Sequence, residues 1–91
     1  MNDLEFLLGC KLKTLYSVLK SMYPTRGYPL TQSQICRRAK MTYSYLHRLL
    51  KAMEGLGLVT RHKLGREVRV SLTDRGETLA KMILFVIQQK L

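Results

Sequence analysis

Four polar side chains recur at helical spacing near the middle of the chain: Ser44, His47, Arg48 and Lys51. Positions i, i+3, i+4 and i+7 share one face of an α-helix, so these side chains form a single polar stripe, with Tyr43 beside its start. Hydroxyl, imidazole and guanidinium groups are donors that contact base edges and phosphates in the major groove of duplex DNA. We therefore expect Tyr43 and the first three members of the stripe to contact bases, and Lys51 to contact the backbone. The alternative is an ordinary solvated helix face.

The net charge favours a polyanionic partner. The 91 residues include 16 Lys+Arg and 6 Asp+Glu, which gives a formal charge of +10 and a pI near 10.1. From Arg37 to Arg69, nine basic residues stand against two acidic ones, a net of +7 that surrounds the polar stripe. Such an excess costs self-repulsion and is typical of nucleic-acid-binding domains, with an anionic membrane surface as the rival partner.

Two capped helices are predicted to position the stripe. Thr31 and Gln34 form a Thr-x-x-Gln capping box, which predicts a helix of about seven or eight residues that ends near Lys40. Thr42 is a second N-cap candidate. Apolar residues then follow at helical spacing and predict a third helix: Leu46, Leu49, Leu50, Met53 and Leu56. Only about three residues separate the two helices, as in a helix-turn-helix.

Apolar spacing also predicts a helix at each end of the chain. At the N-terminal end the apolar residues step by three or four positions: Leu4, Leu8, Leu12, Leu15, Leu19 and Met22. This spacing predicts one helix from Asp3 to Met22, which stops there because Pro24 follows. At the other end, Thr73 is an N-cap candidate with two acidic residues in the next turn, and it begins a helix that runs to about Leu91.

Between the third and last helices the apolar period changes to alternation. Gly57 is placed to end the third helix in the left-handed conformation, and residues 58–60 are typical of a strand. The apolar members of a second strand alternate with polar residues and are Val68, Val70 and Leu72. One face of that strand is therefore expected to be buried. A tight turn at residues 63–66, which contains Gly65, joins the two strands into a basic hairpin.

The order helix, helix, helix, strand, strand, helix predicts a mainly helical α+β fold, the winged helix-turn-helix, as one domain over residues 1–91. Its helix-turn-helix covers about 31–57, its hairpin, here called the wing, about 58–72, and its last helix about 74–91. Besides Lys51, the residues expected to contact the DNA backbone, from the helices or from the wing, are Thr31, Gln34, Arg37, Arg38, Lys40, Thr42, Arg61, Lys63 and Arg66.

Two stretches of sequence resemble one known family. The segment from Thr42 to Val59, TYSYLHRLLKAMEGLGLV, resembles the recognition helix and first wing strand of MarR-type regulators, and SLTDRG, from Ser71 to Gly76, is similar to their passage into the last helix. The resemblance covers roughly Thr31 to Leu79, and this chain has one helix after the wing where that family has a longer arm. It implies a dimeric, sequence-specific transcription regulator of duplex DNA. The alternative is a winged-helix module that binds nucleic acid without sequence preference, or binds protein.

The terminal helices carry more apolar surface than one small domain covers. A homodimer that packs the first and last helices of two subunits would bury this surface and place two recognition helices about 34 Å apart on a palindromic site. The resemblance implies the same arrangement, because MarR-type proteins are dimers built from terminal helices. The residues expected at the interface are Leu4, Leu8, Met82, Phe85, Val86 and Leu91.

Several other classes are disfavoured. Cys10 and Cys36 are too few for a secreted disulfide framework or a zinc site, so we expect buried reduced thiols, with a disulfide within or between subunits as the alternative. The sequence contains no Gly-rich phosphate loop or nucleophile motif, so we expect a non-enzyme without cofactor or metal. Acidic residues stand where a signal peptide is basic, and no apolar run approaches the roughly 20 residues of a membrane span. An intracellular, cytoplasmic protein on DNA is expected, in the host cell if the source is viral.

Overall fold

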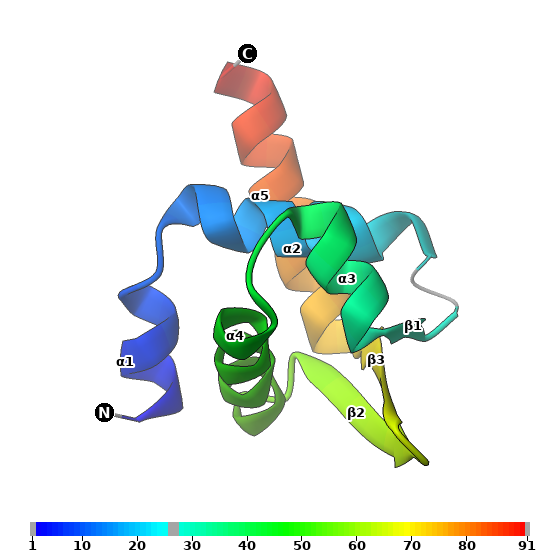
Figure 1. The fold of residues 1–91 in the computed structure, drawn as a ribbon. Helices are drawn as coiled ribbons and strands as arrows, with labels where there is room; N and C mark the ends of the chain where they lie inside the picture. The colour runs from blue at the N-terminus through cyan, green and yellow to red at the C-terminus, as the bar shows by residue number, and fades with distance from the viewer. Residues whose placement is uncertain (1, 26–27, 91) are drawn as a thin grey trace.

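Helices make up most of the fold, and one small sheet completes it. The computed structural model describes residues 2–25 and 28–90. Along the chain its elements are α1 (Asp3–Leu8), α2 (Leu12–Met22), the 3₁₀ turn η1 (Tyr23–Thr25), β1 (Leu30–Thr31), α3 (Gln32–Ala39), α4 (Tyr43–Gly55), β2 (Val59–Leu64), β3 (Glu67–Leu72) and α5 (Asp74–Lys90). The predicted winged helix-turn-helix, mainly helical α+β, is confirmed (Figure 1).

The helix-turn-helix is built from local capping, as predicted. At the start of α3, the Thr31 Oγ1 accepts from the Gln34 amide at 3.1 Å, while Gln34 Oε1 accepts from the Thr31 amide at 2.9 Å. The helix ends at Lys40, which adopts a left-handed conformation with φ of +54°. Two residues later the Thr42 hydroxyl accepts from the Tyr45 amide and begins α4. These caps fix the short turn between α3 and α4.

The wing is an antiparallel hairpin of β2 and β3 in which Leu64 pairs with Glu67 across a two-residue turn. Gly65 begins that turn with φ of +61°, and Gly57 follows α4 with φ of +75°, the left-handed conformation expected from the sequence. A third strand was not expected. The two residues of β1 pair with Val70 and Arg69 of β3, which gives the sheet order β1-β3-β2. A strand this short has too few residues to show alternation.

The single first helix predicted over residues 3–22 was wrong. The chain forms two helices, because α1 ends at Leu8 and α2 begins only at Leu12. The leucine spacing continues across the break, but Phe6 and Leu7 lie off that stripe and pack against the core as partly buried side chains. Turning the chain near Gly9 lays α1 beside α4, where these two side chains lose part of their exposure to water. A straight helix would leave them in solvent.

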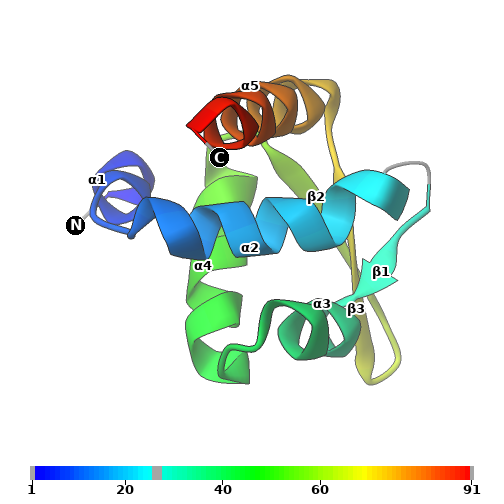
Figure 2. The same cartoon turned by 90° about the horizontal axis from the view of Figure 1, so that it is seen from above.

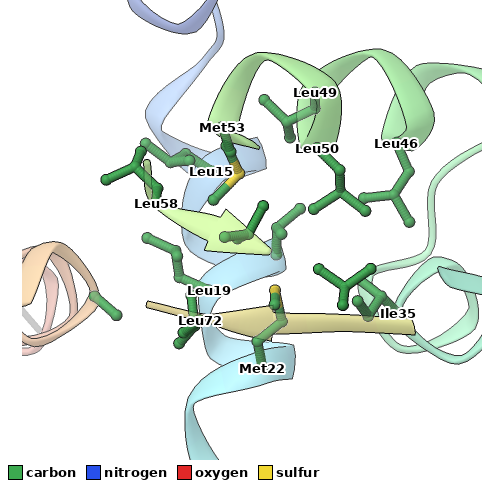
Figure 3. Packing of buried hydrophobic residues seen from close by; sticks show 14 of the residues in the cluster. Leu15, Leu19, Met22, Ile35, Leu46, Leu49, Leu50, Met53, Leu58 and Leu72 are labelled. Atoms are coloured by element: carbon green, nitrogen blue, oxygen red, sulfur yellow. The ribbon is translucent and has the colours of Figure 1, made fainter. Parts of the chain in front are cut away.

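The core joins the polar stripe's helix to the rest of the fold. Figure 2 shows α2 crossing over α4, and Figure 3 shows side chains from both helices meeting those of α3 and the wing. The labelled core residues are Leu15, Leu19, Met22, Ile35, Leu46, Leu49, Leu50, Met53, Leu58 and Leu72. Because the apolar side of α4 packs into this cluster, its polar side faces away from α2.

Candidate nucleic-acid interface

The helix α4 lies between α1 on one side and the wing on the other (Figure 1). The five side chains predicted to face outward are all exposed: Tyr43, Ser44, His47, Arg48 and Lys51. An exposed polar face of a helix is the kind of surface that fits a major groove of DNA. Contact of these side chains with bases stays a prediction.

Arg48 lies at the α1 flank of this face. Its guanidinium carbon is 5.1 Å from the centroid of the Phe6 ring, a cation–π distance. The two residues line a hollow of about 250 Å³ together with Asn2, Asp3, Lys51 and Ala52. No sequence pattern indicated this flank, because α1 was expected to continue straight into α2.

His47 lies at the wing flank and is held by several neighbours. Its Nδ1 is 3.2 Å from Gln32 Nε2 and 3.5 Å from Arg61 Nη1, and its ring stacks on that of Tyr43 at 6.4 Å between centroids. The Arg61 guanidinium also donates from Nε and Nη2 to Glu54 Oε1, at 3.2 and 3.1 Å. Arg61, predicted as a wing residue on DNA, thus lies in β2 with only 15% of its side chain exposed.

Gln32 is the functional candidate that the sequence reasoning missed. It is the first residue of α3 and is 1% exposed, the one buried polar side chain among the described residues. Its Oε1 has no hydrogen-bond partner there. A buried amide normally has its groups satisfied, because leaving one unsatisfied costs about 1–3 kcal/mol. The capping box drew attention to its neighbours Thr31 and Gln34, and no spacing pattern marked Gln32 itself.

The predicted backbone contacts fall into two groups. Arg37 and Arg66 reach one hollow of about 290 Å³ between the start of α3 and the wing, which Thr31, Gln34 and Tyr43 also line. Lys63 and Arg66 are exposed and form no ion pair within the described residues, whereas Arg69 pairs with Glu67 at 3.5 Å.

Arg38 and Lys40 form the second group. They line a different groove, of about 390 Å³, with side chains of α2 that include Lys20 and Ser21, and no α4 or wing residue lines it. Arg38 donates from Nη1 to the Ser21 carbonyl at 3.4 Å. The structure therefore does not bring these two cations together with the polar face of α4.

The predicted interface residues lie on two surfaces. An apolar groove between α2 and α5 is lined by Leu12, Leu79, Met82, Ile83, Val86 and Ile87. Leu4 and Leu8 lie on α1 and do not line this groove, and Phe85 is exposed on α5. Leu91 lies outside the described residues.

Both cysteines are free thiols and are half-buried. The Cys10 sulfur accepts from the Tyr45 hydroxyl at 3.4 Å and donates to the Phe6 carbonyl, while Cys36 donates to the Met41 carbonyl at 2.7 Å. The hydrogen bond to Cys10, together with burial, raises the pKa of Tyr45 above its ordinary value. Reduced thiols were expected, and the alternative of a disulfide between subunits stays untested.

Two further features of the described residues bear on the sequence expectations. No three side chains of His, Cys, Asp or Glu gather there as a metal site. No helix in that part of the chain combines the length and apolarity needed to cross a bilayer.

A sequence profile described as the MarR family matches residues 17–67, from α2 into the start of β3. The chain belongs to the MarR family. Its fold agrees with solved members, which are winged-helix transcription regulators. No curated protein matches the sequence.

Three solved structures illustrate this MarR-family fold. AF1382 from Archaeoglobus fulgidus is 25% identical, with a TM-score of 0.78 over 91% of this chain and 92% of that one. The MarR family transcriptional regulator SPO1453 from Silicibacter pomeroyi DSS-3 is 27% identical, with a TM-score of 0.72 over 90% of this chain and 57% of its own. A mutant of MepR from S. aureus, bound to an oligodeoxyribonucleotide, is 22% identical, with a TM-score of 0.73 over 97% of this chain and 64% of its own. The MarR-family chain thus spans less than two thirds of the last two proteins.

Proposed function

We propose that this MarR-family protein is a dimeric transcription regulator that binds duplex DNA sequence-specifically, with α4 in the major groove and the wing on the adjacent minor groove or backbone. The observation that carries the proposal is the exposed polar face of α4 between two flanks, with the unpaired cations Lys63 and Arg66 on the wing beside it. The oligodeoxyribonucleotide bound to MepR, which shares the fold, supports the same partner. Such a regulator would act on DNA inside the cell.

The side chains divide by role. We assign base contacts to Tyr43, Ser44, His47 and Arg48, which are exposed on α4. Backbone contacts are assigned to Lys51, Lys63, Arg66 and Arg37, whose charges no carboxylate within the described residues neutralises. Arg61 holds the wing to α4 through Glu54, so its role is to fix the angle between the two DNA-contacting elements.

The proposed dimer forms through α5. Met82 and Val86 are exposed apolar residues at the groove that Leu12 lines, and a second copy of α5 would remove this surface from water. Two α4 helices related by a two-fold axis would then contact half-sites about 34 Å apart. A palindromic site follows from that symmetry.

Selection of bound duplexes from a random pool tests specificity, site symmetry and spacing together. We expect a palindromic consensus with half-sites about one helical turn apart, and binding that weakens steeply as salt is raised. Equal affinity for all duplexes would contradict sequence-specific binding. If the protein showed no salt-dependent binding to any duplex, DNA would not be its partner. For the dimer, Met82→Glu should yield monomers in light scattering, whereas Lys81→Glu, an exposed neighbour on α5, should not.

A second candidate is charge-driven binding of nucleic acid without sequence preference. One observation favours it: Lys20, Arg38 and Lys40 line a groove that no part of α4 or the wing lines, so positive charge is not confined to the base-contacting face. This candidate predicts that Arg48→Ala and Lys63→Ala weaken binding to every duplex equally.

A further inference from the structure

His47 turns one ring nitrogen toward two hydrogen-bond donors from different elements. The Gln32 side-chain nitrogen, from α3, lies 3.2 Å from Nδ1, and the Arg61 Nη1, from β2, lies 3.5 Å from the same atom. The Tyr43 ring stacks on the imidazole, with 11° between the two ring planes. The ring of an exposed residue on α4 is therefore held in place by the helix before it and by the wing.

The chemistry of Arg61 determines which way these hydrogen bonds run. A guanidinium has only donors, so an imidazole nitrogen that faces it must accept. Nδ1 then carries no proton, and Gln32 must present its NH₂ group rather than its oxygen. In the neutral ring the single proton is consequently on Nε2.

The two donors are themselves constrained. Arg61 is bound through Nε and Nη2 to Glu54, so it cannot turn away without breaking an ion pair with 3.1 Å between the charged atoms. Gln32 is buried, and its Oε1 stays without a partner among the described residues while its nitrogen faces His47. The amide thus keeps its bond to His47 although its oxygen is left unsatisfied.

We propose that Gln32 and Arg61 are positioning residues that fix His47 as the Nε2–H tautomer, so that α4 presents a hydrogen-bond donor to the base opposite His47. The inference rests on the proposed function. In the major groove a donor pairs with N7 or O6 of guanine, O4 of thymine or N7 of adenine, whereas cytosine presents only the donor of its amino group. The base preference at this position should accordingly disfavour cytosine.

The tautomer is measured on the protein without DNA. Long-range ¹H–¹⁵N correlation spectra of the ring at a pH where it is neutral distinguish a proton on Nε2 from one on Nδ1, and a His62→Gln background leaves His47 as the single histidine. We expect Nε2–H in this protein. In the double variant Gln32→Glu/Arg61→Met, which replaces one donor by an acceptor of the same shape and removes the other, we expect a proton to appear on Nδ1. A proton on Nδ1 with Gln32 and Arg61 in place overturns the inference, and so does a double-variant spectrum that is unchanged.

The base preference is measured by selection of bound duplexes. We expect cytosine at the His47 position to be disfavoured about fivefold, the effect of one net hydrogen bond, and Gln32→Met, which removes one of the two donors to Nδ1, to reduce that bias while other positions keep theirs. Gln88→Met, the same change at an exposed site on α5, is the matched control and should leave the preferences unchanged. A Gln32→Met profile identical to that of the control overturns the specificity claim. Loss of all sequence preference in the unaltered protein instead refutes the proposed function, and the NMR result stands independently of it.

Discussion

The guanidinium of Arg48 lies 5.1 Å from the centre of the Phe6 ring, so the helix proposed to enter DNA touches the first helix of the chain through a cation–π contact. The Phe6 ring also lies 6.5 Å from that of Tyr45, on the same side of α4. Stacking uses the face of a guanidinium and leaves its N–H edge free to donate. We infer that α1 restrains the orientation of a proposed base-contacting residue while its donors remain available.

The Phe6 contact predicts a graded loss of specificity. Arg48→Ala should relax the base preference at its own position, because a bidentate contact to guanine discriminates by about 1–3 kcal/mol. Phe6→Leu keeps Arg48 but removes the ring, so we expect a smaller loss at the same position, about two- to fivefold, from the cation–π contribution of an exposed pair. Selection of bound duplexes with both variants measures whether Phe6→Leu loses less base preference than Arg48→Ala. A Phe6→Leu profile equal to that of the unaltered protein would show that the ring does not orient Arg48.

The wing cations predict a loss of affinity that is the same for every sequence. Lys63→Ala and Arg66→Ala should each weaken binding to specific and random duplexes alike, and reduce the slope of log affinity against log salt by about one. Lys81→Ala removes an exposed charge from α5 and serves as the control, with an unchanged slope. Fluorescence titration over a series of salt concentrations measures all three. Sequence-dependent effects of Lys63→Ala would contradict its assignment to the backbone.

Local signals in the sequence were enough to predict most of the fold. The capping box at Thr31 and Gln34, the cap at Thr42 and the left-handed Gly57 all depend on neighbouring residues, and each was confirmed. The break after Leu8 was not predicted, because the leucine spacing is the same for one helix as for two. Contact with α4, distant in sequence, determines that break, and a one-dimensional pattern does not contain it.

The candidate site shows the same division. The exposed face of α4 follows from the apolar spacing on its other side, so Ser44 and Lys51 could be placed outward from the sequence. The neighbours of His47 could not, because Gln32 and Arg61 lie 15 and 14 positions away and meet it only after α3, α4 and β2 pack together. The pairing of Arg61 with Glu54 depends on that packing and is not visible in the sequence. Arg61 was therefore predicted as a wing cation that contacts DNA.

The raised pKa of Tyr45 predicts a change in stability at alkaline pH. The folded state holds the phenol proton more tightly than the unfolded chain, chiefly through the bond to Cys10 and through burial. This contribution is fully present below the unfolded value of about 10 and is lost as pH rises through the folded pKa. Urea unfolding between about pH 8 and 11 should therefore show a steeper loss of stability above about pH 10 in the unaltered protein than in Tyr45→Phe. Tyr28→Phe, at an exposed tyrosine, is the control, and equal pH dependence in all three proteins would contradict the prediction.

Two helical glycines are expected to differ in how strongly alanine affects the stability of the fold. At Gly76, in the first turn of α5, an added Cβ would collide with the backbone oxygen of Leu58, so the helix or the start of the wing must move. At Gly55, the last residue of α4, the Cβ would meet the side-chain oxygen of Asp3 instead, and that side chain can rotate away.

We expect Gly76→Ala to lower the free energy of unfolding by about 2 kcal/mol or more, as overpacking against a fixed atom does. Gly55→Ala should change it little, because the gain in helix propensity, up to about 1 kcal/mol, is offset by displacement of Asp3. Combining Gly55→Ala with Asp3→Ala should reveal that gain, and urea unfolding of the single and double variants measures it. If Gly76→Ala were as stable as Gly55→Ala, the close approach of α5 to the Leu58 carbonyl would not be the reason for glycine at this position.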